Sequence, residues 1–447
     1  MLAAIEKELE QEAFVAIGVH SPKFPNERDA DAVRDAVRRY GVTHPVVVDS
    51  GMRIWQEFGV SAWPTLVLID ARGYVVGAGS GEPDKATLLR AIRGVLDNDA
   101  HEGHLDAKPL PLIPEPVPPG SLAYPGKVIT AGDMVVIADT GHNQVVVCDS
   151  AGTEGQRYGN PEGGFSDGEG TDARFRHPNG LAVNGDVLFV ADTGNHAIRE
   201  IDLGSGVVKT LAGTGEKGHG GSPGGPGMLT PLRSPWDLAW DGTRLLIAMA
   251  GAHQIWAYQP SSGLVLVLAG TGMERRVDGS AMRAAFAQPS GLALVGDSLF
   301  IADSEVSSIR AIDALHAEPT ARTVCGSGDL FGFGDEDGIG ERALLQHPIG
   351  IAAGDGMLYV ADTFNHKIRR VDPRTGECVT LFGGGGPERL PELVPGHALT
   401  DAAPGVPAFH EPEGIAWRDG ELLVADTNNH RVLSISLDGG SRRVFFG

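Results

Sequence analysis

Histidine, asparagine and aspartate recur together in short turns along the last three quarters of the chain. The clearest copies read Asp-Thr-x-Asn-His and end at His196, His366 and His430. Side chains of these types bind metals when they converge from different elements. An Asp and an Asn in a short hairpin loop, however, also bond nearby backbone amides and stabilise the turn. We interpret the turns as structural and expect neither a metal nor another cofactor.

The structural positions of the repeat are the Asp of each copy and the Asn-His pairs of the clearest three. We expect each Asp to bond backbone amides of its own loop, and each His to pack within that loop. These positions are Asp139, Asp192, Asp303, Asp362, Asp426, Asn195, His196, Asn365, His366, Asn429 and His430.

Four other short motifs invite a chemical interpretation but lack the context that the chemistry requires. Asp335–Gly338 lacks the spaced carboxylates of a calcium loop. Gly213–Gly218 has the letters of a dinucleotide fingerprint and Gly220–Gly224 those of a nucleophile elbow, yet neither precedes a helical segment. His101–His104 is one residue short of the zincin spacing. We therefore assign no catalytic or cofactor-binding residue.

Charge and cysteine content limit the partner and the compartment. The 58 acidic residues exceed the 36 basic residues, and the net charge of −22 disfavours nucleic acid and membrane surfaces as partners. Cys148, Cys325 and Cys378 form neither a Cys-x-x-Cys nor a zinc spacing, and we expect all three to be unpaired and buried. Met1–Glu12 has no apolar signal-peptide core. We expect a cytoplasmic protein.

A repeat with one internal offset organises the chain from about residue 120 onward. A proline lies 14 residues before each Asp position, and in the copy around Met249 that position holds Met instead of Asp. The prolines are Pro125, Pro178, Pro235, Pro289, Pro348 and Pro412. Each unit predicts four short strands, and four-stranded sheets repeated radially make a β-propeller. We predict six blades, with Gly180–Val183 and its equivalents innermost.

The first 97 residues have a different pattern, in which apolar strands alternate with helices. Ala30–Tyr40 and Lys85–Leu96 have helical periodicity, and Thr65–Ile69 is an apolar strand that follows Trp63 and Pro64. This order predicts an α/β layer. Six prolines between residues 98 and 121 predict an extended spacer between the two parts.

The repeats closely resemble NHL repeats, and residues 58–66 resemble the cis-proline stretch of thioredoxin-like proteins. Both parts in this order resemble the NHL repeat-containing protein 2-like family. The resemblance implies a multidomain chain: a thioredoxin-like domain at residues 1–97, a linker at 98–121 and a six-bladed NHL propeller at 122–447. We expect the α/β domain to be incomplete, because its first core strand and its Cys-x-x-Cys are absent from this sequence, which is apparently truncated at the N-terminus.

Two functions from different classes remain open. The first is a protein-interaction scaffold with a redox-inactive thioredoxin-like domain, in which Trp63 and Pro64 are a possible peptide-binding site and the long loops 216–234 and 383–411 carry recognition. The second is a thiol–disulfide oxidoreductase, which would need an upstream Cys-x-x-Cys. Thiol–disulfide exchange requires an activated thiolate, so we expect no enzyme activity from the chain as given. We expect the partner to be a protein or a peptide.

Overall fold

The computed structural model describes residues 2–106, 108, 110–116, 119–384, 386–387, 408–438 and 442–447. The chain forms two compact units, residues 1–117 and 118–447. Most of the loop 383–411, one of the two expected recognition loops, lies outside the described residues. No helix within the described residues is long and apolar enough to cross a membrane.

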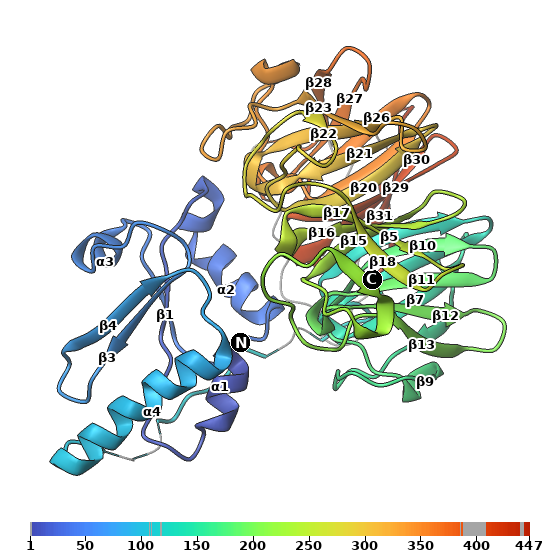
Figure 1. Ribbon diagram of the computed structural model, residues 1–447. Coiled ribbons are helices and arrows are strands. Elements are labelled where there is room, and N and C mark those ends of the chain that lie inside the picture. The colour runs from blue at the N-terminus through green and yellow to red at the C-terminus, as the bar shows by residue number, and fades with distance from the viewer. Residues whose placement is uncertain are drawn as a thin grey trace. The chain divides into compact units, whose positions relative to one another are not determined.

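Unit 1 is an α/β unit with four short strands in two separate pairs (Figure 1). Strand β1 pairs in parallel with β2, and β3 pairs antiparallel with β4. Its elements are α1 (Leu2–Glu8), β1 (Gly18–His20), η1 (Pro25–Arg28), α2 (Ala30–Arg39), β2 (Val46–Val48), α3 (Arg53–Glu57), β3 (Thr65–Ile69), β4 (Val75–Ser80) and α4 (Lys85–Glu102).

The two strand pairs of unit 1 are not joined by hydrogen bonds in the described part of the chain. Ile5 of α1 and Leu9, which follows that helix, pack with Ile92 of α4 and with Leu68 of β3. Helix α4 continues six residues beyond the expected end at Leu96.

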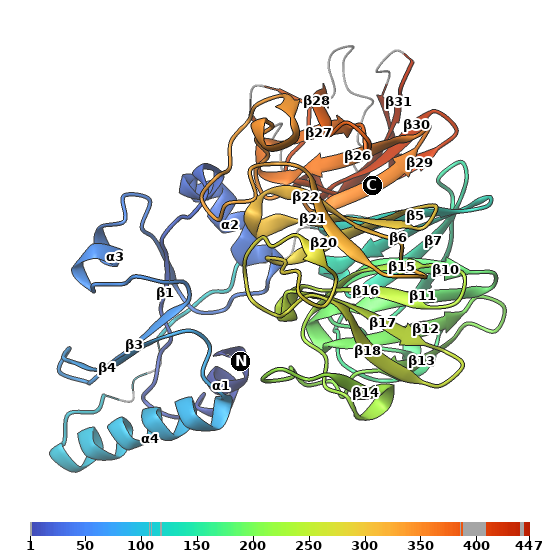
Figure 2. The ribbon, with the colours of Figure 1, turned by 45° about the horizontal axis from the view of Figure 1, so that its top comes forward.

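Unit 2 is a propeller of six sheets that follow one another in chain order, as the colours show in Figure 2. The blades consist of β5 (Pro125–Ala131), β6 (Met134–Asp139), β7 (Gln144–Asp149) and β8 (Glu154–Tyr158); β10 (Pro178–Asn184), β11 (Val187–Asp192), β12 (Ala197–Asp202) and β13 (Val207–Ala212); β15 (Pro235–Trp240), β16 (Leu245–Met249), β17 (Gln254–Gln259) and β18 (Leu264–Ala269); β20 (Pro289–Val295), β21 (Ser298–Asp303), β22 (Ser308–Asp313) and β23 (Thr320–Cys325); β25 (Gly350–Gly354), β26 (Met357–Asp362), β27 (Lys367–Val371) and β28 (Glu377–Phe382); and β29 (Pro412–Arg418), β30 (Glu421–Asp426), β31 (Arg431–Ser436) and β32 (Arg442–Phe446).

Four blades carry a short fifth strand that four-stranded units did not predict. Each fifth strand pairs with the outermost strand of its blade and leads toward that blade's innermost strand. These strands are β9 (Gly168–Glu169), β14 (Gly224–Pro226), β19 (Gly279–Ser280) and β24 (Gly338–Ile339).

The constant offset between proline and aspartate has a direct structural cause. Pro178 begins the innermost strand of its blade and lies opposite Asp192, the last residue of the next strand. The hairpin loop lies between these two residues, so the 14-residue offset from proline to aspartate is the length of the hairpin. The same pairing joins Pro125 to Asp139 and Pro412 to Asp426.

The first strand of each blade is innermost, as predicted, because β5, β10, β15, β20, β25 and β29 each contact the next around a closed ring. A Cβ at Gly350 would overlap the carbonyl oxygen of Glu413 in the next blade, so glycine permits this close approach. Apolar side chains from neighbouring blades form a separate core at each of the six junctions.

Candidate binding site on the third blade

The Asp of the repeat forms a buried ion pair with an arginine from the neighbouring strand. In the second blade Asp192 accepts hydrogen bonds from Asn195 Nδ2 at 2.9 Å and from Arg199 Nη1 at 2.8 Å. Arg199 is fully buried and its Nη2 donates to Asp167 at 2.8 Å. The other oxygen of Asp192 accepts from the amide of Arg176, 16 residues earlier. The expectation that the Asp bonds amides of its own loop is therefore wrong.

The same arrangement occurs in two further blades. Asp303 pairs with Arg310, which also reaches Asp278, and Asp362 pairs with Arg369, which also reaches Asp337. Asp337, in the stretch Asp335–Gly338 for which we rejected a calcium loop, thus holds an arginine. Burial raises the pKa of Asp192 and of Asp303 to about 6, although the neighbouring arginine opposes the shift.

Residues in the same turn also connect each blade to the next. His196 Nδ1 accepts a hydrogen bond from the backbone N–H of Ser234 at 3.1 Å, and Thr193 Oγ1 donates to Pro235 O at 2.6 Å. His366 and His430 likewise accept from the backbone of the following blade. The expectation that the histidines pack within their own loops is therefore wrong, because they link neighbouring blades.

The third blade lacks the ion pair and the hydroxyl bond of this set, although Met249 Sδ still accepts from the Arg233 amide at 3.3 Å, as Asp192 accepts from the Arg176 amide. Met249 occupies the place of Asp192, and Trp256 follows it by seven residues, as Arg199 follows Asp192. Ala250 has no hydroxyl to match that of Thr193. His253 Nδ1 is buried and has no hydrogen-bond partner among the described residues, and burial lowers the pKa of His253. The third blade is therefore neutral and apolar where other blades carry buried charge.

The second acidic position of the ion-pair set, Asp167 in the second blade, is also changed. Val208 pairs with Gly168 at the outer edge of the second blade, and Val265 pairs with Gly225 in the third. Gly224 therefore occupies the place of Asp167 in the third blade. All three charged partners are replaced together by Met249, Trp256 and Gly224, which leaves no isolated buried charge behind.

A small pocket lies beside these replacements. Its cavity is about 20 Å³, enough for a group the size of a water molecule. The lining residues are Gly218, His219, Gly220, Ser222, Pro231, Arg233, Ala252, Gln254 and Trp256. They come from the connection into the third blade, from the turn after β16 and from β17. The sequence prediction of a recognition loop at 216–234 thus includes six of the lining residues.

Arg233 is the charged group of this pocket. Its Nε atom is buried and makes no hydrogen bond, and its guanidinium makes no ion pair, within the described part of the chain. Trp256 Nε1 donates to Gln254 Oε1 at 3.0 Å, which fixes the orientation of the indole. An unpaired guanidinium beside an oriented aromatic ring is suited to a carboxylate attached to an apolar group.

Trp63 and Pro64, the possible peptide-binding residues, lie in unit 1 before β3. Their peptide bond is cis, as the resemblance implied. Trp63 is 45% exposed as a residue, and its indole Nε1 donates to Ser21 O at 2.9 Å. Its ring centroid lies 4.3 Å from that of Trp55. Trp63 is thus an oriented aromatic surface in unit 1, where the sequence contains no cysteine.

The sequence pattern revealed the altered Asp position but not the pocket. The signal that could have found it is a second offset, because arginine follows the Asp by seven residues at Arg199, Arg310 and Arg369. Trp256 interrupts that series. The convergence of Arg233 with Trp256 depends on the path of the entering loop, which no periodicity encodes.

The fold and these turns define the class of protein, a β-propeller of NHL repeats with a thioredoxin-like unit. The NHL repeat family profile matches residues 175–201 and 409–433. The chain is 39% identical over 464 residues to NHL repeat-containing protein 2 of Homo sapiens, covering 96% of this chain and 62% of that protein. The chain belongs to the NHL repeat-containing protein 2-like family.

Two further relatives match nearly the whole chain and a short part of it, respectively. Protein SUPPRESSOR OF QUENCHING 1, chloroplastic, of Arabidopsis thaliana is 40% identical over 461 residues, which cover 98% of this chain and 43% of that protein. Thiol-disulfide oxidoreductase ResA of Bacillus anthracis is 42% identical over 64 residues, 13% of this chain and 37% of that protein. The chain thus spans less than two thirds of the length of these relatives.

Proposed function

We propose that this protein is a protein-interaction scaffold whose propeller binds a protein partner at the third-blade pocket. The observation that carries the proposal is Arg233, a half-buried arginine whose Nε atom is buried and whose guanidinium has no partner among the described residues, next to Trp256. Five blades use the equivalent space for a buried ion pair or its variant, and the third blade leaves a pocket instead. Loops on a rigid scaffold commonly carry recognition.

The chemistry of the pocket defines the partner. The guanidinium favours a carboxylate, and Trp256 favours an apolar or aromatic neighbour in the same segment. The net charge of −22 opposes long acidic segments and nucleic acids. We therefore propose a peptide segment of a protein partner with a single carboxylate beside an apolar side chain, and the cytoplasm as the compartment.

A peptide-library selection on the full chain tests this function. The peptides that bind should share a carboxylate next to an apolar residue and should lose binding to the Arg233→Gln variant. The matched control is Arg374→Gln, because the Arg374 side chain is 83% exposed and lies in the fifth blade. The proposal would be refuted if the selected peptides shared no carboxylate. It would also be refuted if they bound Arg233→Gln, Arg374→Gln and wild type with equal affinity.

The thioredoxin-like unit is, in this proposal, a redox-inactive binding module that presents Trp63. The match to ResA and the cis peptide before Pro64 favour the alternative, a thiol–disulfide oxidoreductase. Against it, the only cysteines of the sequence are the buried Cys148, Cys325 and Cys378 of the propeller. An insulin-reduction assay on this chain should read as background, and turnover above background would favour the enzyme.

A further inference from the structure

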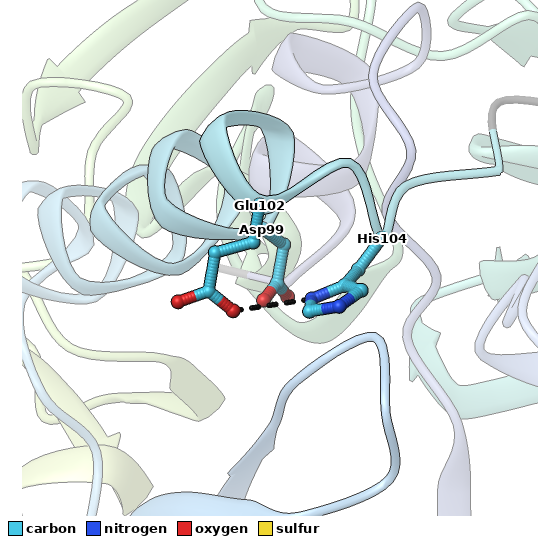
Figure 3. Close-up of side chains that lie close together, drawn as sticks. All are labelled: Asp99, Glu102 and His104. Atoms are coloured by element: carbon cyan, nitrogen blue, oxygen red, sulfur yellow. Dashed lines mark ion pairs between the residues drawn. The ribbon is translucent and has the colours of Figure 1, made fainter.

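Three side chains with metal-ligating atoms gather at the end of α4 in unit 1. Asp99, Glu102 and His104 each place one ligand atom within 4.8 Å of the others. Figure 3 shows the two carboxylates and the imidazole on the same side of the helix end. The His104 Nδ1 and Glu102 Oε2 atoms are 3.2 Å apart. The cluster belongs to a different unit from the third-blade pocket.

The helix end itself brings His104 back toward the carboxylates. Gly103 adopts a left-handed conformation with φ of 73°, which reverses the chain direction after Glu102. The N–H of His104 then donates to Asp99 O at 2.9 Å. His104 thus lies over the last turn of α4, where the helix C-terminus carries partial negative charge that favours a cation.

Asp99 gives the second, independent observation. It is only 2% exposed, although carboxylates are rarely buried without full pairing. One oxygen accepts from the Ala71 amide at 2.8 Å, whereas Oδ1 has no hydrogen-bond partner among the described residues. A buried carboxylate oxygen without a donor is costly, and a cation supplies the missing interaction.

The neighbouring protein cation does not fill this role. Arg72 Nη1 lies 4.0 Å from Glu102 Oε2, and Arg72 Nη2 lies 3.4 Å from Asp70. No ion pair within the described residues involves Asp99. The two cluster carboxylates therefore keep coordination capacity for another cation.

We propose that Asp99, Glu102 and His104 bind one divalent transition-metal ion of the zinc class. Imidazole with carboxylates is a donor set that zinc accepts, at about 2.0–2.2 Å from each ligand atom. Two ligands of a tetrahedral ion at about that distance lie roughly 3.3 Å apart, close to the separation between His104 and Glu102. Three protein ligands leave the fourth position open to water or to another group.

Cobalt(II) absorption and zinc equilibrium dialysis on the full chain test the site. The wild-type chain should bind one ion that His104→Ala loses, with affinity reduced at least tenfold, and Asp99→Asn should also weaken binding. The matched control is His101→Ala, an exposed histidine of the same helix that lies outside the cluster, which should bind as wild type. Circular dichroism melts of the apo forms verify that each variant is folded.

Two results would overturn the site. One is an absence of any ion whose binding differs between wild type and His104→Ala, when both proteins are folded. The other is equal loss in His104→Ala and His101→Ala, which would indicate nonspecific histidine binding. Glu102→Gln provides a further folded variant, because Glu102 is exposed and its substitution disturbs no core residue.

Discussion

Trp256 of the third blade occupies the position that Arg199 has in the second blade. Each lies on the third strand of its sheet, seven residues after the last residue of the second strand, which is Met249 in the third blade and Asp192 in the second. Arg199 is fully buried against Asp192, whereas Trp256 borders a pocket with Arg233. Replacing both partners of a buried pair avoids the cost of an isolated charge. The third blade therefore leaves no unpaired aspartate where the other blades carry the ion pair.

The first prediction concerns the cost of breaking the pair. Asp192→Met alone leaves Arg199 buried without its carboxylate, and should lower the free energy of unfolding by about 3–5 kcal/mol. Adding Arg199→Met should recover part of this loss, because no buried charge remains. Denaturant unfolding measures both, with the exposed Asp186→Ala as control, which should change stability by less than about 0.5 kcal/mol. A double variant less stable than Asp192→Met would contradict this interpretation.

The second prediction concerns the link between blades. Thr193→Ala removes the hydroxyl that donates to Pro235 O and should cost about 0.5–1.5 kcal/mol. Ala250→Thr places a hydroxyl at the equivalent position of the third blade, where the carbonyl of Pro289 is the corresponding acceptor, and should stabilise by a similar amount. Thermal melts of the two variants provide the comparison. Destabilisation by both would show that the third blade does not share the geometry of the second.

The third prediction concerns thiol reactivity. Burial raises the pKa of Cys148 to about 12, and a hydrogen bond with the Cys378 thiol together with burial raises the pKa of Cys325 well above its usual range, so both stay protonated at pH 8. Cys378 is equally buried. Ellman's reagent should detect no fast-reacting thiol in the native protein and three thiols after denaturation in urea. A thiol that reacts within seconds in the native protein would contradict the buried assignment.

The fourth prediction concerns Asp49, whose carboxylate accepts hydrogen bonds from the first backbone amides of α3. Burial would raise its pKa, but hydrogen bonds from the amides of Trp55, Ile54 and Arg53 and from the Ser21 hydroxyl lower it overall. A lowered folded pKa means that the stabilisation is present above the ordinary value of about 3.9 and is lost as the pH falls through the folded value.

The stability difference between wild type and Asp49→Asn should therefore shrink from pH 6 to pH 3. Urea unfolding followed by tryptophan fluorescence measures that difference, since Trp55 and Trp63 lie close to the cap. A difference that is constant with pH would mean that the Asp49 charge does not contribute.

The sequence predicted the architecture because the repeat encodes local hairpins. Pro178 and Asp192 are cross-strand partners, so the offset marks the first hairpin of each blade, and its six copies give the number of blades. The buried arginines were not predicted, because the strand that supplies the arginine and its distance along the chain from the Asp vary between blades. Asp139 is paired by Arg157 from the fourth strand, and Asp426 by Arg431, only five residues on. Contacts of this kind depend on three-dimensional convergence rather than on spacing.

In unit 1, too, features set by a local motif were predicted, whereas contacts that depend on three-dimensional convergence were not. The cis peptide at Trp63–Pro64 follows from a local motif and is confirmed. The convergence of Asp99 with His104 depends on the left-handed Gly103 and on the contact with Ala71, neither of which a helical period reveals.

The affinity of a selected peptide for Arg233→Gln, measured by calorimetry on the full chain, tests the central claim most directly. Loss of a charge-assisted hydrogen bond in the third-blade pocket should weaken binding at least tenfold, since such bonds contribute about 1.5–3 kcal/mol. Arg374→Gln should bind as wild type, and thermal melts should show both variants folded. Equal affinity of wild type and Arg233→Gln would contradict the assignment of this pocket as the recognition site.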